Sequence, residues 1–356
     1  MDWSARVAIW IIATGVIAAI LYMLRDALTP FALALILWLA IDGLAEWLDK
    51  RIPYTPRWLA LPIALVLVLG MVTLIGWVVV TNISAMTSDF ALYEARLDQL
   101  IAQVYATFQV RGPPPTLAAI AARIDPARLA GDVGSSLRNV ASDAGFILIY
   151  LAFLFPASAV MPKKFNFMFG RGEARTAARD VMHRIRDSME RYLWVQTVVS
   201  LIITALTYVT LMVLGLQNAL FWAFLIFFLN YIPTIGSVVA VALTTLVALV
   251  QFSSLAQVAG VFVGVGGWQF LIGNFIQPRM TSDSLNLSAV VMLLALSVWS
   301  AIWGLAGAFL AAPLTVMLMI VLAQFPGTRW IAILLSADGK PTPDSLHLSK
   351  SESGSN

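Results

Sequence analysis

The sequence predicts an all-α, polytopic membrane protein. Hydrophobic residues make up 60% of the 356 residues and charged residues only 12%, a balance far from that of soluble globular proteins. The apolar residues are gathered into long uncharged runs, of which 62–82 is the clearest. A bilayer core of about 30 Å requires about 20 apolar residues in a helix. Only helices and closed barrels satisfy their backbone hydrogen bonds in lipid, and these runs are too long and continuous for barrel strands.

The first two predicted helices follow one another closely. The run 7–24 leads through Arg25 and Asp26 into a shorter run, 27–41, and we expect the two to form a hairpin. The start MDWSAR resembles a signal peptide, but no small-residue cleavage site follows, which favours a retained first helix. About five full transmembrane helices are predicted, with 27–41 as a short hairpin partner: 7–24, 59–82, 144–161, 192–214 and 255–277.

Two further apolar stretches are interrupted in the middle. The stretch 219–250 is broken by NYIPTIGS at 230–237, and 287–322 is broken by WSAIWG at 299–304. A helix of about 14 residues, typical of these halves, is about 21 Å long. That is shorter than a ~30 Å bilayer core. The lengths predict two broken or re-entrant helical hairpins, with short tilted spans as the alternative.

The order of these elements suggests an inverted repeat. The helix over 192–214 is expected to run outward and to be followed by a hairpin that enters from outside. The helix over 255–277 is expected to run inward and to be followed by a hairpin that enters from inside. Paired segments interrupted by Gly and Pro in two oppositely oriented halves point to a transport site near the bilayer midplane.

Charge placement predicts the orientation. The segment 162–191 carries eight Lys and Arg residues and is therefore placed in the cytoplasm. Both termini then lie in the cytoplasm. The loop 83–143 is then outside the membrane, where its amphipathic pattern predicts a helical cap. The predicted segments are N-terminal transmembrane helices at 1–82, the extracytoplasmic loop at 83–143, a transmembrane helix with a basic cytoplasmic helix at 144–191, the transport core at 192–325, and a polar, disordered cytoplasmic tail at 326–356.

Several functions are excluded or disfavoured by what the sequence lacks. It has no cysteine, and its two histidines, His183 and His347, lie in polar segments, so neither a thiolate site nor a histidine metal site in the membrane is predicted. No P-loop, H-E-x-x-H or G-x-S-x-G motif occurs. We therefore predict no cofactor, no metal, no catalytic residue and no enzyme activity. The net charge of +3 is small and does not indicate a nucleic-acid partner.

Polar residues inside the apolar stretches are the candidate substrate path. A buried amide in a bilayer costs free energy unless it is hydrogen-bonded, so these residues serve either as contacts between helices or as a path for a polar solute. Pro233 and Gly236 would break the helix and free backbone groups, and Arg279 would lie at the inner mouth. The predicted path comprises Asn230, Tyr231, Pro233, Thr234, Gly236, Ser237, Gln269, Asn274, Gln277, Pro278 and Arg279.

Ionisable residues are rare in the apolar stretches. Asp42, Glu46 and Asp283 are the candidates for coupling transport to an ion. Each lies close to an expected membrane interface, and the alternative is that it only anchors a helix end there.

Three motifs carry a resemblance to a known family. They are NYIPTIGS at 230–237, GNFIQPRM at 273–280 and WGLAGAFLAAPL at 303–314. With the whole membrane portion, from about 7 to 325, the chain resembles the autoinducer-2 exporter family of bacterial inner-membrane proteins. The resemblance implies a permease-like protein that forms homo-oligomers, with a pentamer as the expected form. Some members are linked to export of a small signalling molecule and some to sodium/proton antiport.

The chain departs from the family pattern after Met280. Members often carry a Met-Gly step and a His-Pro pair there, whereas this chain has Thr281-Ser282-Asp283. The missing histidine removes a titratable group and weakens the case for antiport.

The leading hypothesis is a membrane permease or exporter for a small polar solute, with the solute, the lipid bilayer and further copies of the chain as partners. A sodium/proton-type antiporter and a non-transporting assembly or scaffold protein are the alternatives.

Overall fold

The computed structural model describes residues 3–51, 126–168, 173–281 and 286–339, with a few isolated positions between 62 and 105. Within these ranges the chain is helical apart from turns and an isolated bridge between Leu287 and Ser336. Five of the described helices are long and apolar enough to cross a membrane. The all-α membrane fold is therefore confirmed. The predicted helix 59–82, most of the loop 83–143, Asp283 and the tail beyond 339 lie outside the described residues, and the division into five segments stays a prediction.

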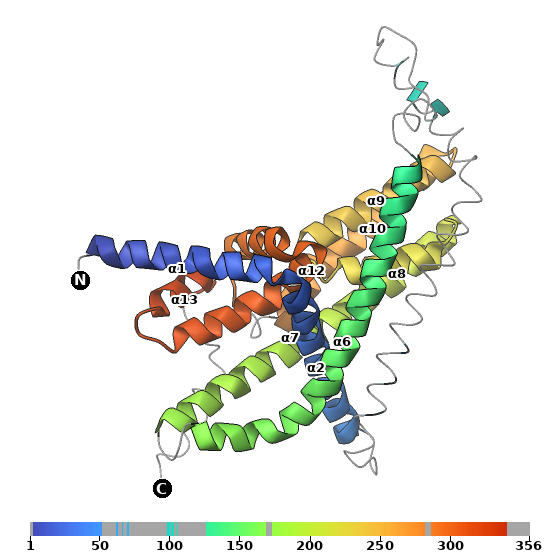
Figure 1. Ribbon diagram of the computed structural model, residues 1–356. Coiled ribbons are helices and arrows are strands. Elements are labelled where there is room, and N and C mark those ends of the chain that lie inside the picture. Colours follow the sequence, from blue (N-terminus) through green and yellow to red (C-terminus); the bar gives the residue numbers. More distant parts are fainter. Residues whose placement is uncertain are drawn as a thin grey trace.

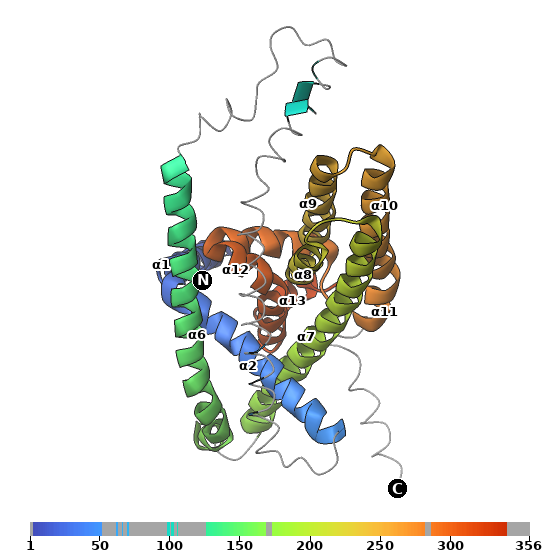
Figure 2. The ribbon, with the colours of Figure 1, turned by 90° about the vertical axis from the view of Figure 1, so that its right-hand side faces the viewer.

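The N-terminal helices are α1 (Trp3–Met23) and α2 (Arg25–Arg51), which meet at a bend. From this bend they diverge (Figures 1 and 2), so the expected side-by-side hairpin is corrected to a bent pair. The α2 helix is also longer than the predicted run 27–41, because the charged residues after that run form ion pairs with a neighbouring helix instead of ending the helix. Trp303 Nε1 donates to the carbonyl oxygen of Leu21 at 3.2 Å and ties α1 to α12.

Two long helices follow, α6 (Pro126–Met168) and α7 (Glu173–Leu214). The predicted cytoplasmic helix and the membrane helix 192–214 are thus one continuous α7. In Figure 2, α2 runs diagonally from α6 towards α7. Ala34 and Ile41 of α2 are buried in a small core with Leu151 of α6.

The C-terminal core begins with α7, α8 (Ala219–Leu229), α9 (Ile235–Gln251) and α10 (Leu255–Leu271). A π-helical turn (Ile272–Ile276), α11 (Gln277–Thr281), α12 (Ala289–Ala323) and α13 (Arg329–Leu335) complete it. Because lipid is as apolar as these side chains, close packing holds such helices together more than the hydrophobic effect does. Small residues allow this approach: Ala240 and Ala248 are fully buried, and a Cβ added to Gly264 would lie 2.5 Å from Thr210 Cγ2.

The first interrupted stretch is a helical hairpin formed by α8 and α9. Its turn holds Thr234 at φ 62°, ψ −54°, a conformation that is unusual for a β-branched residue. The two arms are so close that a Cβ on Gly236 would lie 1.7 Å from the carbonyl oxygen of Leu229.

The second interrupted stretch, α12, also folds back on itself. Gly304 adopts φ 62°, ψ −139° inside it, a backbone conformation restricted to glycine. Trp299 Nε1 donates to Thr315 Oγ1 at 3.2 Å although the residues are 16 positions apart, a separation that a straight helix would stretch to ~24 Å. A Cβ on Gly307 would lie 1.9 Å from the carbonyl oxygen of Trp299. Both predicted interruptions are therefore confirmed as breaks at which the chain reverses.

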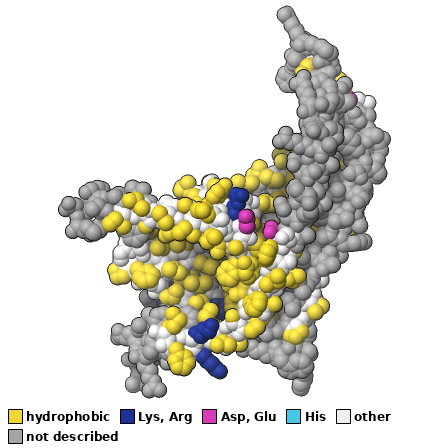
Figure 3. Space-filling view, viewed as in Figure 1, with side chains coloured by type: hydrophobic (Ala, Val, Ile, Leu, Met, Phe, Trp, Pro, Cys, Tyr) yellow, Lys and Arg dark blue, Asp and Glu magenta, His cyan; other side chains and the backbone are white. Residues whose placement is uncertain are grey.

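The turns of the two hairpins meet. Ile232 of the first hairpin packs with Leu296, Ala308 and Ala311 of the second. The ring of Tyr231 stacks on that of Phe309 with 4.9 Å between centroids. On the described part of the face in Figure 3, most of the coloured side chains are hydrophobic, as expected for a surface in contact with lipid.

Replacing Gly236 with alanine should destabilise the protein. The new methyl group would overlap the carbonyl oxygen of Leu229, so the arms of the first hairpin must separate, at a cost of about 3 kcal/mol. Thermal unfolding in detergent should show a clearly lower melting temperature. Gly267→Ala in α10 is the control, because no atom lies within 4 Å of its added Cβ. Equal melting temperatures for the two variants would contradict the close approach.

Candidate functional site

A network of side-chain amides surrounds the turn of the first hairpin. Gln196 Nε2 of α7 donates to the carbonyl oxygen of Asn230 at 2.7 Å. Gln269 Nε2 of α10 donates to Asn230 Oδ1 at 3.0 Å. Gln277 Nε2 donates to Gln196 Oε1 at 3.2 Å. These bonds join α7, the α8–α9 turn, α10 and α11, and they satisfy polar groups that would otherwise be costly inside apolar helices.

Tyr231 fixes the same turn to α7 through a second contact. Its hydroxyl lies 2.7 Å from Thr197 Oγ1. Thr197 uses its only hydroxyl hydrogen to donate to the carbonyl oxygen of Leu193 at 2.6 Å, so Tyr231 is the donor to Thr197. The turn is thus held at two successive residues.

The π-helical turn sets the register of the two glutamines. An α-helix advances about 100° per residue, so Gln269 and Gln277, eight positions apart, would diverge by about 80°. A π turn takes up one extra residue, and the remaining seven steps leave only about 20° between them. Because of the turn at Ile272–Ile276, both side chains can reach the network around Gln196.

A groove borders this network. It has a volume of about 630 Å³ and lies between α9 and α10. Ser237, Gln269 and Asn274 form its polar end next to the hairpin turn, and apolar residues such as Val238 and Phe262 line most of the rest. Gln269 belongs to both the groove and the amide network.

The family model described as AI-2E family transporter matches residues 9–327 of the chain. The chain belongs to the AI-2E transporter family.

Relatives in this family cover nearly the whole length of the chain. The AI-2 transport protein TqsA of Escherichia coli K12 is 29% identical over 333 residues, which are 92% of this chain and 95% of TqsA. The "Putative transport protein" of Haemophilus influenzae is 27% identical over 337 residues, which are 93% of this chain and 96% of the relative. The chain is thus a multi-pass membrane protein of a transporter family, as the sequence motifs had indicated.

In this AI-2E family member the predicted path residues separate into four groups. Asn230, Tyr231, Gln269 and Gln277 are brought together in or beside the network. The others shape the turn, line the groove or lie on the exposed surface of α11. Pro233, Thr234 and Gly236 form the turn, Ser237 and Asn274 line the groove, and Pro278 and Arg279 are exposed.

Sequence reasoning missed Gln196 and Thr197. Gln196 is the centre of the network, since it donates to Asn230 and accepts from Gln277. The available signal was an amide and a hydroxyl side by side in the otherwise apolar run 192–214. Only the folded chain shows that they face the hairpin turn.

One donor of the network has no partner. The amide nitrogen of Asn230, Nδ2, is buried and makes no hydrogen bond among the described residues. A buried, unpaired donor costs about 1–3 kcal/mol. A bound hydrogen-bond acceptor would remove this cost.

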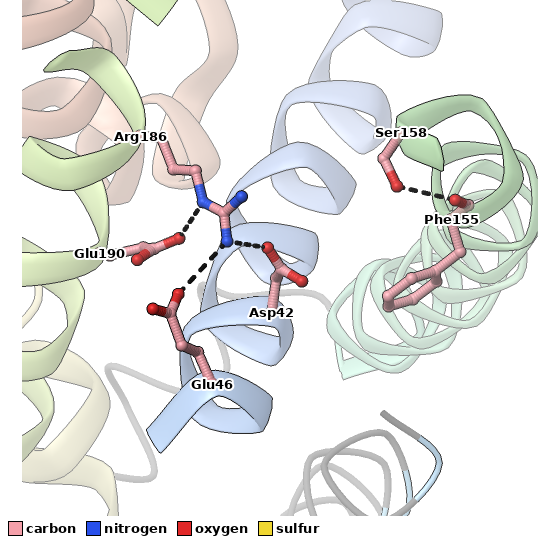
Figure 4. Close-up of polar contacts among 6 residues, drawn as sticks. All are labelled: Asp42, Glu46, Phe155, Ser158, Arg186 and Glu190. Atoms are coloured by element: carbon pink, nitrogen blue, oxygen red, sulfur yellow. Dashed lines mark hydrogen bonds and ion pairs between the residues drawn. The ribbon is translucent and has the colours of Figure 1, made fainter. Parts of the chain in front are cut away.

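The predicted ion-coupling residues Asp42 and Glu46 lie elsewhere, at the crossing of α2 and α7 (Figure 4). Arg186 Nη2 of α7 lies 2.5 Å from Asp42 Oδ2 and 3.5 Å from Glu46 Oε2. Its Nε lies 2.6 Å from Glu190 Oε1. Three carboxylates therefore share one guanidinium, which fixes α2 to α7. Whether they also couple transport to an ion stays a prediction, and Asp283 lies outside the described residues.

Metal ligation is not indicated by this arrangement. Over the described ranges, no group of three or more His, Asp or Glu residues is placed to hold a metal ion.

Arg186→Gln should destabilise the crossing of α2 and α7. It leaves three carboxylates close together without a cation. Breaking a fully buried pair costs about 3–5 kcal/mol, but these side chains are partly exposed, so we expect about 2 kcal/mol. Thermal unfolding of the purified protein measures this. Arg179→Gln, at an exposed position of the same helix, should change little. Adding Asp42→Asn to Arg186→Gln should recover part of the loss, and a further loss would contradict the ion-pair assignment.

Proposed function

We propose that this chain is a permease that exports a small polar solute across the bacterial inner membrane. The observation that carries the proposal is the amide network at the first hairpin turn, where Gln196, Asn230 and Gln269 converge among apolar helices. Neutral amides can replace the water molecules that hydrate the hydroxyl or carbonyl groups of a solute, without introducing a charge. Because TqsA is named an AI-2 transport protein, a small signalling molecule is a candidate substrate.

The geometry of the two hairpins supports this proposal. Irregular backbone at membrane depth is tolerated where it is buried in protein or lines a cavity, and transporters use such broken helices to bind substrates. Here both turns contact each other through Tyr231 and Phe309. The unpaired Asn230 Nδ2 supplies a donor for a bound solute.

The assembly and orientation are part of the proposal. We expect a homo-oligomer, with a pentamer as the form that the family resemblance implies. Both termini are expected in the cytoplasm because of the positive charges at 162–191.

The antiporter alternative is favoured by one observation, the three carboxylates around Arg186. An excess of negative charge at a half-buried site could bind a proton or a sodium ion. Reconstituted vesicles in which sodium flux is lost on Asp42→Asn or Glu46→Gln would support it. Sodium flux that is unchanged in both variants would contradict the antiporter alternative. The scaffold alternative predicts no flux of any kind and a stoichiometric partner on purification.

Gln269→Leu and Asn230→Leu should abolish export. Each removes an amide of the network while keeping an apolar side chain of similar size, so assembly should persist and transport should fall at least about tenfold. Untargeted mass spectrometry of the medium, from cells with the intact protein, each variant or no protein, identifies the exported compound. Gln324→Leu is the matched control, since among the described residues the side chain of Gln324 bonds only to the carbonyl oxygen of Ile320, one turn earlier in the chain. Export that survives both network changes would contradict this site.

A further inference from the structure

The groove between α9 and α10 has a polar end and an apolar end. Its polar end, formed by Ser237, Gln269 and Asn274, adjoins the turn of the first hairpin. Towards the other end of the two helices it is lined by Val241, Leu246 and Phe262. From Ser237 to Leu246 the groove extends ~14 Å along α9, at 1.5 Å per residue. A ligand in it would therefore meet hydrogen-bonding groups at one end and hydrocarbon along the rest.

The groove carries no ionisable side chain among its lining residues. A charged ligand would be costly in such surroundings because nothing there compensates its lost hydration. Polar recognition is available only through amides and hydroxyls. The chemistry thus selects against carboxylates, phosphates and ammonium groups.

Two unpaired polar groups lie in or beside the groove. The hydroxyl of Thr245, a lining residue, is buried without a hydrogen-bond partner among the described residues. Thr244 and Thr210 bond to the carbonyl four residues before them, at Ala240 and Leu206, whereas Thr204 and Thr207 of α7 are unpaired among the described residues as Thr245 is. Asn230 Nδ2, also unpaired, belongs to a side chain that Gln269 contacts. Both atoms are enclosed by protein atoms, so a molecule in the groove would reach them only after a side chain rotates, and its first polar contacts are the lining residues Ser237, Gln269 and Asn274.

We propose that this groove binds an uncharged amphiphile, with its hydroxyl or carbonyl head at Ser237, Gln269 and Asn274 and its hydrocarbon part along Val241 and Phe262. The inference rests on the proposed function, because it makes the groove the part of the export site that selects the substrate. It defines the substrate class as neutral molecules with a polar head and a short apolar chain.

The absence of cysteine allows a direct test. A thiol introduced by Ala242→Cys would be the only one in the chain and would lie in the middle of the groove. The full chain in lipid nanodiscs is treated with N-ethylmaleimide, with 1,2-butanediol, 1,2-hexanediol or 1,2-octanediol present or absent. Hexanoate serves as the charged probe of matched chain length. Val263→Cys, on α10 but outside the groove lining, is the control and is 66% exposed.

We expect the diols to slow labelling at Ala242→Cys by at least threefold, with the effective concentration falling by about two- to fourfold per added methylene. Hexanoate should not protect, and labelling at Val263→Cys should not change. No protection, equal protection by hexanoate, or equal protection at Val263→Cys would overturn the proposal. A thiol that reacts only after the lipid is replaced by detergent would also overturn it, because an acyl chain would then occupy the groove.

The test separates this proposal from the export function. If Gln269→Leu abolishes export but the diols give no protection, the export proposal is supported and the groove proposal is contradicted. Diol protection with export unaffected by Gln269→Leu would support the groove and contradict the amide network as the export site, and diol protection with no export by the intact protein would contradict the export proposal alone.

Discussion

The structure depends on the need to satisfy backbone and amide groups where a helix reverses inside apolar surroundings. At the first hairpin the turn places the carbonyl oxygen of Asn230 outside any regular helix, and Gln196 satisfies it at 2.7 Å. Within the turn, the amide of Gly236 donates to the carbonyl oxygen of Ile232 at 3.0 Å. An unpaired group at this depth would be expensive, since no water is available to replace a partner. Gln196 of α7 therefore stabilises the turn by satisfying a backbone group, whereas Gln269 of α10 bonds only to the side chain of Asn230 among the described residues.

In both hairpins a glycine allows the two arms to approach closely. In the first, Gly236 lies against the carbonyl of Leu229, and in the second, Gly307 lies against that of Trp299. Any side chain at these positions would force the arms apart. The close arms then let the two turns meet through Ile232, Leu296 and Ala308. Two sequences without evident similarity thus build related turns, which agrees with the inverted repeat expected from the order of elements.

The sequence could predict the breaks because their signals are local. Pro233, Gly236 and Gly304 interrupt uncharged runs, and such interruptions shorten a helix wherever it lies. It could not predict Gln196 as the centre of the site, because its partners are 34 and 81 positions away. The register of Gln277 depends on a π turn that has no local sequence signal. The length of α2 was underestimated because Asp42 and Glu46 resemble a helix end until Arg186, 144 and 140 positions away, is seen to pair with them.

The α7 helix joins these two regions and sets an order among their contacts. Arg186 holds α2 and Gln196 holds the first hairpin turn, and the ten positions between them span ~15 Å of one helix. The contacts at Arg186 are charge-assisted, which makes them about twice as strong as the neutral amide bonds around Asn230. Moving the hairpin turn away from Gln196 would break neutral amide bonds, whereas separating α2 from α7 would break the stronger ion pairs. In the proposed export site, a bound solute that takes over the hydrogen bonds of Asn230 would lower the cost of moving the turn away from Gln196.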